Sequence, residues 1–166
     1  MKFRNLANSL LPLAILAGCG SAPPQPLKAR ITEFGRYDRG TESVREDTAA
    51  PSGQSRGSSG YRLKETTEMV ALRLGESFGF CYEVSGFAPG ARPAVVIQTD
   101  HPPFSRPGGT SVSQHQFVRN LMPSEGLLSD CTGYGFDHPF ELVPGNWRFT
   151  VVVDGKNILT QAFSAR

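Results

Sequence analysis

The feature that most constrains the fold is an alternation of apolar and other residues on both sides of one turn dipeptide near the C-terminus. The side chains expected on one face of the first strand are large and apolar: Trp147, Phe149, Val151 and Val153. Asp154-Gly155 then provides two residues that readily adopt the positive φ of a tight hairpin turn, and the chain returns over residues 157–164. A half-buried antiparallel hairpin is therefore predicted here.

The register of that hairpin has two solutions. A regular two-residue turn would place Ile158 and Ala162 on the Trp147 face, whereas one bulged residue would place Leu159 and Phe163 there. The second register buries the two larger side chains, so we prefer it.

Further strands are predicted where apolar alternation or β-branched runs stand between turn residues. They cover residues 29–38, 70–74, 78–84, 94–99 and 111–118. No segment behind the N-terminal region has helical periodicity. These patterns predict a single all-β domain over residues 29–166, an antiparallel immunoglobulin-like β-sandwich of about seven strands.

One long segment lacks the apolar residues that a strand needs. Over residues 39–60, Val44 is the only large apolar side chain among Gly, Ser, Thr, Arg and acids. Such a composition buries too little to offset its ordering entropy. We therefore expect a mobile loop over 39–60, which is either functional or disordered, and the absence of a motif favours disorder.

An irregular apolar stretch over residues 119–130 interrupts the strand pattern. Pro123 and Gly126 stand within it, and its large apolar side chains are Leu121, Met122, Leu127 and Leu128. It is either a lid on the core or an exposed contact surface. We take these four side chains as a hypothetical surface for a protein partner.

The N-terminus has the pattern of an export signal. Lys2 and Arg4 precede a short apolar run that ends in Leu16-Ala17-Gly18-Cys19, and this run is too short to span a bilayer as a mature helix. The four residues resemble the lipobox of bacterial lipoproteins. The resemblance implies a signal peptide over 1–18, acylation of Cys19, and localisation in the cell envelope.

Two details extend this lipoprotein interpretation. The Pro-rich residues 19–28 are expected to form an extended membrane tether. Gly20 behind the lipidated cysteine resembles the outer-membrane sorting pattern, so the domain would face the periplasm. An incidental Cys19 in an ordinary secretory signal is the alternative.

The two remaining cysteines are expected to pair. The chain has three cysteines, and assigning Cys19 to lipid leaves Cys81 and Cys131 in a compartment that favours disulfides. The alternative is two separate buried thiols, because Cys81 stands in an apolar run.

Charge and motifs exclude several functions. Removing Lys2 and Arg4 leaves 15 basic residues against 15 acidic ones, so the mature chain lacks the basic footprint of a nucleic-acid binder. Signatures of common enzymes are absent, and no cofactor is indicated. The three histidines, His101, His115 and His138, are weak candidates for a metal site. Two stand in Asp-His-Pro triplets, which are more simply explained as turns at strand ends.

Several segments together resemble a bacterial family of secreted domains, DUF3859. They are residues 29–35, Phe78-Gly79-Phe80 with Tyr82, Thr132-Gly133-Tyr134 and, most specifically, residues 141–147. The resemblance covers residues 29–163, implies a β-rich fold and provides no catalytic residue. The cysteine pair and the long polar loop depart from the family pattern.

The function expected from these features is non-enzymatic. We expect a lipid-anchored envelope protein that binds or assembles with a protein partner. A periplasmic small-molecule or metal-binding protein is the alternative, and a hydrolase is a more distant one.

Overall fold

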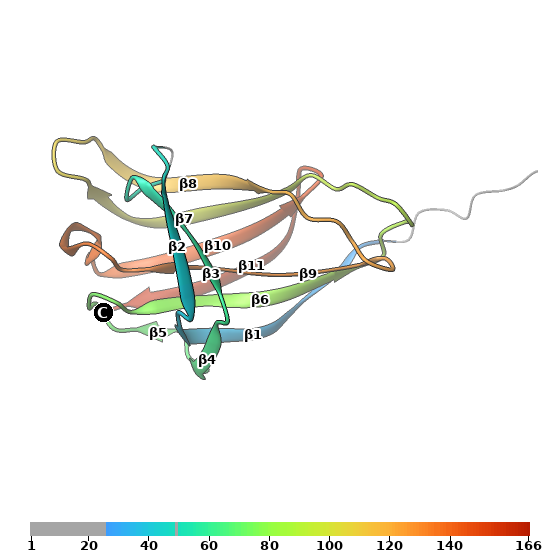
Figure 1. Cartoon of the computed structure of the whole chain (residues 1–166), viewed down its shortest axis with the longest axis horizontal. Helices are drawn as coiled ribbons and strands as arrows, with labels where there is room; N and C mark the ends of the chain where they lie inside the picture. Colours follow the sequence, from blue (N-terminus) through green and yellow to red (C-terminus); the bar gives the residue numbers. More distant parts are fainter. Residues whose placement is uncertain (1–25, 49) are drawn as a thin grey trace, which may run out of the picture.

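The computed structural model describes residues 26–48 and 50–166, and these form two packed sheets with an added hairpin (Figure 1). One sheet has the order β4 (Arg62–Glu65), β1 (Lys28–Asp38), β6 (Ser77–Ser85), β9 (Leu127–Gly135). The other has the order β5 (Met69–Val70), β11 (Lys156–Ala165), β10 (Gly145–Val153), β7 (Val95–Ser105), β8 (Ser111–Arg119). The third sheet is the hairpin of β2 (Thr41–Glu46) and β3 (Gln54–Ser59). We call the first two the β6 sheet and the β10 sheet.

The predicted all-β sandwich is confirmed. Neighbouring strands are antiparallel except for the short parallel pair of β5 and β11. Between them the two large sheets hold more strands than the seven expected, because the short strands β4 and β5 extend them. The 3-10 turn η1 (Pro139–Glu141) follows β9.

The core consists of aromatic and β-branched side chains on the facing sides of the two large sheets. Phe78 of β6 is fully buried, and its ring contacts those of Trp147, Phe149 and Phe163 at centroid distances of 5.6, 6.0 and 5.2 Å. All three contacts are edge-to-face, the arrangement that ring quadrupoles favour. These alternating side chains fix which face of each strand points inward.

The C-terminal hairpin has the predicted bulged register. Trp147 pairs with Phe163 and Val151 with Leu159, and the register shifts between Val151 and Val152. Asp154 and Gly155 have φ values of 48° and 77°, as the tight turn requires.

Cys81 and Cys131 form the expected disulfide. They are directly opposite residues of β6 and β9, and their Cα atoms are 4.0 Å apart. The bond joins the edge strand β9 to the centre of its sheet, and Cys131 is exposed to solvent.

Two strand boundaries differ from the prediction. Of the strand expected over 70–74, only Val70 lies in a strand, the two-residue β5, and the strand ends before Ala71. Conversely, β7 runs past Asp100-His101-Pro102 to Ser105, with an irregular register between Asp100 and Phe104. The prolines lie in this irregular segment, where no ladder hydrogen bond is required of them.

The segment over 39–60, expected to be a mobile loop, instead forms for the most part the hairpin of β2 and β3. Every residue of β2 is exposed, so apolar burial does not stabilise it. Ion pairs to the sandwich do so instead, and sequence composition does not reveal such pairs.

The irregular stretch over 119–130 ends in a strand, which corrects the hypothetical partner surface. Leu128 lies in β9 opposite Val84 and is 2% exposed, so it belongs to the core. Leu121 is half-buried against the core. Met122 and Leu127 are exposed, at 64% and 40%.

The predicted signal peptide over 1–18, the lipidation site Cys19 and the tether as far as residue 25 lie outside the described residues. Within the described part of the chain, no helix has the length and hydropathy needed to cross a membrane. Pro26 leads directly into β1 at one end of the sandwich (Figure 1).

Candidate binding cleft

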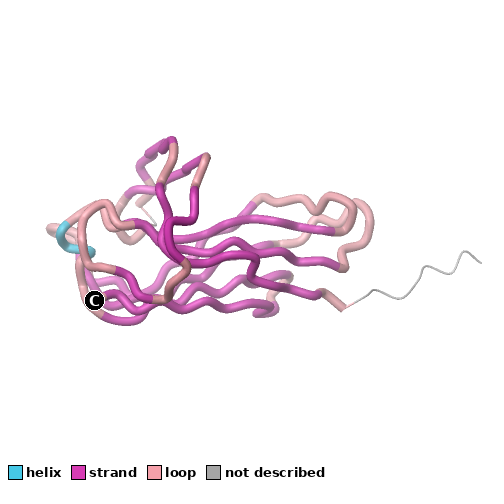
Figure 2. Tube along the Cα trace, turned by 90° about the horizontal axis from the view of Figure 1, so that it is seen from below, coloured by secondary structure: helices cyan, strands magenta, loops and turns pink. Residues whose placement is uncertain are grey.

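The hairpin of β2 and β3 spans a cleft instead of packing flat on the sandwich. Figure 2 shows its two strands projecting from the body of the molecule. At its base, Arg39 and Arg56 each place a guanidinium nitrogen 2.5 Å from the carboxylate of Asp137, which follows β9. Glu42 pairs with both arginines, at 3.4 and 3.2 Å. At its tip Pro51 is buried, so the hairpin is held at both ends.

The space beneath it is a cleft of about 640 Å³. Its wall is continuous along two strands, residues 115–119 of β8 and residues 130–135 of β9. Alternate residues of a strand point to opposite faces, so a wall made of consecutive residues is formed by the strand's own edge. Both β8 and β9 are edge strands of their sheets.

Part of the floor is free of side chains. Gly79 of β6 lies opposite Gly35 of β1 on one side and Gly133 of β9 on the other. A Cβ on Gly79 would lie 2.2 Å from the carbonyl oxygen of Thr132, and one on Gly133 would lie 2.2 Å from that of Phe78. Only glycine therefore permits this close approach of β6 and β9.

The inner side chains of β8 form a stacked row at the entrance between the two large sheets. The ring of His115 stacks on that of Phe117 at 6.1 Å, and the guanidinium carbon of Arg119 lies 5.0 Å from the Phe117 ring centre. Arg119 also donates a hydrogen bond of 2.9 Å to the carbonyl oxygen of Cys131. It thereby occupies one acceptor on the edge of β9.

Two uncharged polar atoms of the cleft wall lack a hydrogen-bond partner among the described residues. They are Nδ1 of His115 and Oγ1 of Thr132. Burial lowers the pKa of His115 from 6.5 to about 4, and the nearby His101 adds to this effect. His115 is therefore neutral near pH 7, and the site can offer uncharged hydrogen-bonding groups to a ligand.

A buried carboxylate holds the turn beside the cleft. Glu141, 1% exposed, accepts hydrogen bonds from the hydroxyl of Tyr134 at 2.7 Å and from the backbone N–H groups of Asp137 and His138 at 2.6 and 2.8 Å. Burial and the Glu141 charge raise the pKa of Tyr134, so its hydroxyl stays protonated. This arrangement fixes Asp137 where the hairpin arginines reach it.

The three histidines proposed as weak metal ligands do not form one cluster: His101 and His115 are neighbours, and His138 lies apart from them. His101 is 5% exposed and stacks between Phe104 and Trp147, at 4.6 and 4.9 Å. His115 lies 6.0 Å from it, and His138 precedes η1, where its ring stacks on Phe140. Among the described residues, no three His, Cys, Asp or Glu side chains are placed to hold a metal ion.

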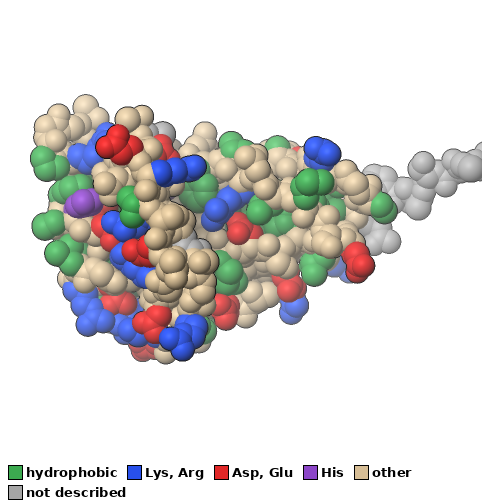
Figure 3. All heavy atoms as spheres, viewed as in Figure 1, with side chains coloured by type: hydrophobic (Ala, Val, Ile, Leu, Met, Phe, Trp, Pro, Cys, Tyr) green, Lys and Arg blue, Asp and Glu red, His purple; other side chains and the backbone are tan. Residues whose placement is uncertain are grey.

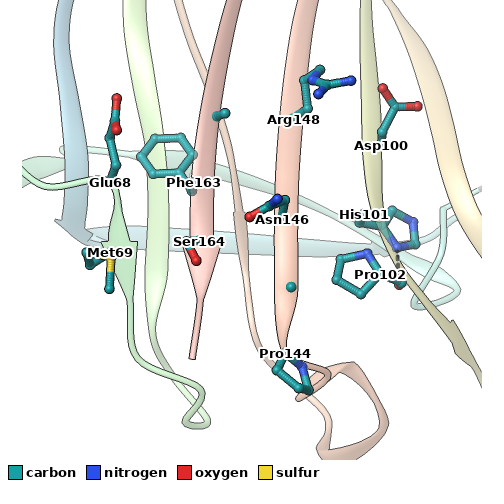
Figure 4. A pocket seen from close by; sticks show the side chains of 12 residues that line it. Glu68, Met69, Asp100, His101, Pro102, Pro144, Asn146, Arg148, Phe163 and Ser164 are labelled. Atoms are coloured by element: carbon teal, nitrogen blue, oxygen red, sulfur yellow. Dashed lines mark hydrogen bonds between the residues drawn. The ribbon is translucent and has the colours of Figure 1, made fainter.

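A second hollow, of about 550 Å³, lies across strands β7, β10 and β11 (Figure 4). Asp100 and Arg148 face each other across β7 and β10 there, and His101 also lines the hollow. It is open to solvent and has no unpaired edge strand in its wall except the two-residue β5.

The sequence analysis missed the cleft. Five of its charged residues fall in the segment assigned to a mobile loop: Arg39, Glu42, Arg45, Asp47 and Arg56. One signal was available: Gly79 and Gly133 each interrupt a strand pattern between large residues, which indicates a close backbone approach.

Two packed sheets with Trp147 and Phe149 in the core define the class as an immunoglobulin-like β-sandwich, here with an added hairpin. The chain belongs to the family described as Domain of unknown function (DUF3859), whose model matches residues 28–165. Among curated proteins, no match was found.

Solved structures support the fold assignment. An immunoglobulin-like protein from Pseudomonas aeruginosa superposes with a TM-score of 0.60 at 23% identity, covering 87% of this chain and 100% of that one. An alkylpurine DNA glycosylase of Pseudomonas fluorescens gives a TM-score of 0.41 at 18% identity, covering 59% of this chain and 29% of its own. A β-glucosidase of Listeria innocua gives 0.39 at 10% identity, covering 84% and 16%. The first likeness concerns the fold alone, and the other two are too distant to support an argument.

Proposed function

We propose that this protein is a non-enzymatic lipoprotein of the bacterial envelope, anchored through Cys19 at the periplasmic face of the outer membrane. We propose further that it binds an extended segment of a protein partner along the edge of β8. The lipobox-like residues support the anchor. The exposed edge of β8 at the cleft supports the binding mode.

The observation that supports binding at β8 most strongly is that this edge strand has no charged residue or proline before its last residue, Arg119. Edge strands present unpaired N–H and C=O groups, and proteins usually protect them with charges, prolines, bulges or short length. The edge strand β4 has charged residues at three of its four positions, and β5 has two residues. Arg119 occupies a carbonyl of β9. By contrast, β8 has no Lys, Arg, Asp, Glu or Pro from Ser111 to Val118.

Strand addition to an edge is a common mode of peptide recognition, in which backbone hydrogen bonds provide affinity and side-chain contacts provide specificity. Gln116 and Val118 line the cleft beside the β8 edge, and Val118 is 68% exposed. An added strand would cover Val118 and run beneath the hairpin. The balanced ion pairs of the hairpin base give the site no strong preference for a charged segment.

The test is to place charged side chains on the edge strand β8, so that a partner strand can no longer pair with it. Gln116→Lys and Val118→Lys place charges on β8 without entering the core, so we expect partner recovery from detergent-solubilised envelopes to fall at least tenfold while the melting temperature changes little. Thr160→Lys, on an exposed position of β11, is the matched control. Equal recovery with all three variants would contradict the proposal.

A small polar ligand is the second candidate, because the unpartnered Nδ1 of His115 and Oγ1 of Thr132 both line the cleft. A cleft of about 640 Å³ is within the usual size of small-molecule sites. Native mass spectrometry of the protein purified from its host tests this directly. A bound small molecule that is lost in His115→Phe would favour this candidate over strand addition.

A further inference from the structure

We propose that the end of the sandwich from which the N-terminal segment leaves is a membrane-contacting surface, and that its occupant is the lipid bilayer itself. The inference extends the proposed function, since it rests on acylation of Cys19. It concerns a different region from the β8 cleft. The surface consists of two loops: residues 86–94, between β6 and β7, and residues 120–127, which lead into β9.

The two loops form one continuous surface with the N-terminal segment. The N–H groups of Gly86 and Phe87 both donate hydrogen bonds to the carbonyl oxygen of Gly126, at 3.2 and 3.3 Å. Gly86 also lies against Pro26, because a Cβ at position 86 would be 2.9 Å from the Pro26 carbonyl oxygen. Figure 1 shows both loops at the end where the chain departs, opposite the C-terminus.

The composition of this surface suits a lipid interface. Each loop contains a single charged residue, Arg92 in one and Glu125 in the other. Met122 and Leu127 are 64% and 40% exposed, and Ala88 and Pro89 are exposed beside them. Figure 3 shows hydrophobic side chains at this end, with separate acidic and basic side chains among them. Exposed apolar side chains gathered at one end of a domain indicate a contact surface.

A tight turn fixes the position of Leu127, five residues after Met122 in the same loop. Ser124 and Leu127 exchange two backbone hydrogen bonds, of 2.8 and 2.9 Å, around Glu125 and Gly126, both of which have positive φ. The exposed side chain of Leu127 is therefore held on an ordered turn.

The length of the connecting chain identifies the bilayer as the occupant. Seven residues, 20–26, separate Cys19 from Leu27. At most about 3.5 Å per residue, they reach about 25 Å. With the acyl chains of Cys19 in the membrane, this end of the sandwich stays within that distance of the headgroups, where apolar side chains gain by leaving water.

The test uses the full-length acylated protein in vesicles of phosphatidylethanolamine with a minor fraction of phosphatidylglycerol. The chain's three cysteines are assigned to acylation and the disulfide, so Met122→Cys adds one free thiol for an environment-sensitive fluorophore. Thr110→Cys, in the β7–β8 turn at the opposite end, is the matched control. Spin-labelled lipids should quench the fluorophore at position 122 several-fold more than at position 110.

A second variant tests the role of the apolar side chains. Leu127→Asp should reduce the quenching at position 122 at least twofold, and a thermal melt of that variant checks that the fold is retained. Equal quenching at 122 and 110 in acylated protein would overturn bilayer contact while leaving the anchor intact. Cross-linking of position 122 to an integral membrane protein, without lipid quenching, would overturn it in favour of a protein partner. A Cys19 peptide without acyl chains would overturn both the anchor and this inference.

Discussion

The guanidinium of Arg56 lies 2.5 Å from the carboxylate of Asp137, and this ion pair connects the exposed hairpin to the end of β9. Arg56 and Asp137 are 81 positions apart in the sequence. The contact ties the hairpin to the sandwich beside the cleft. It also explains how a segment without apolar residues has a defined place in the fold.

Removing this ion pair should loosen the hairpin without unfolding the domain. Arg56 and Asp137 side chains are 29% and 15% exposed, so we expect Arg56→Gln to destabilise the hairpin by about 1 kcal/mol or less. Amide exchange over residues 41–59 should accelerate while exchange in β6 and β10 stays unchanged. Arg45→Gln, a hairpin arginine for which no ion pair is found among the described residues, is the control. Equal acceleration in both variants would show that the Asp137 contact does not hold the hairpin.

The facing glycines Gly79 of β6 and Gly133 of β9 should not tolerate a side chain. We expect Gly79→Ala and Gly133→Ala each to cost about 1–3 kcal/mol or more, because the added Cβ meets a backbone carbonyl oxygen at 2.2 Å. Chemical denaturation measures the free energy of unfolding. Gly109→Ala is the control, since its added Cβ would lie no closer than 3.3 Å to the nearest atom. A cost for Gly79→Ala no greater than for Gly109→Ala would mean that β6 and β9 separate easily.

Burial of neutral His115 should make stability depend on pH. Its folded-state pKa of about 4 lies below the ordinary value of 6.5, so protons bind preferentially to the unfolded chain. The contribution of His115 is therefore fully present above about pH 6.5 and is lost as pH falls toward 4, with a slope of at most about 1.4 kcal/mol per pH unit. His115→Gln should flatten the unfolding free energy in that window relative to the parent. Parallel pH profiles for the two proteins would contradict this assignment.

The disulfide should stabilise the domain. It closes a loop across 50 positions, so the chain-entropy model predicts about 4 kcal/mol, and measured values often fall below this. Replacing both Cys81 and Cys131 with Ser should lower the free energy of unfolding, and reductant should lower it only in the parent protein. Non-reducing peptide mapping should recover the two cysteines linked. Free thiols at both positions in freshly isolated protein would contradict the pairing.

Local patterns predicted the parts of the fold that apolar burial stabilises. Trp147, Val151 and Phe163 alternate in phase with the sheet, so burial alone selected the bulged hairpin register. The pairing of Cys81 with Cys131 could be predicted from the number of cysteines, because these two remain once Cys19 is assigned to lipid.

The rest depended on contacts between distant residues. Ion pairs of Arg39 and Arg56 with Asp137 hold the hairpin in place of apolar burial. Because the segment has few apolar residues, its composition predicted disorder where the structure has a hairpin. Leu127 and Leu128 are identical neighbours in the sequence, but their side chains point to opposite faces of β9. Only the pairing of β9 with β6 shows that Leu128 lies in the core and Leu127 on the surface.

The β8 edge is the central element of the proposed function, and photo-cross-linking in intact cells tests it most directly. A photoreactive amino acid at Val118 lies beside the edge of β8 in the cleft, and one at Thr160 lies on an exposed part of β11 in the same sheet. We predict a discrete envelope-protein adduct from Val118 that disappears when Gln116→Lys is added, and no such adduct from Thr160. The same adducts from both positions, or none from Val118, would contradict binding at the β8 edge.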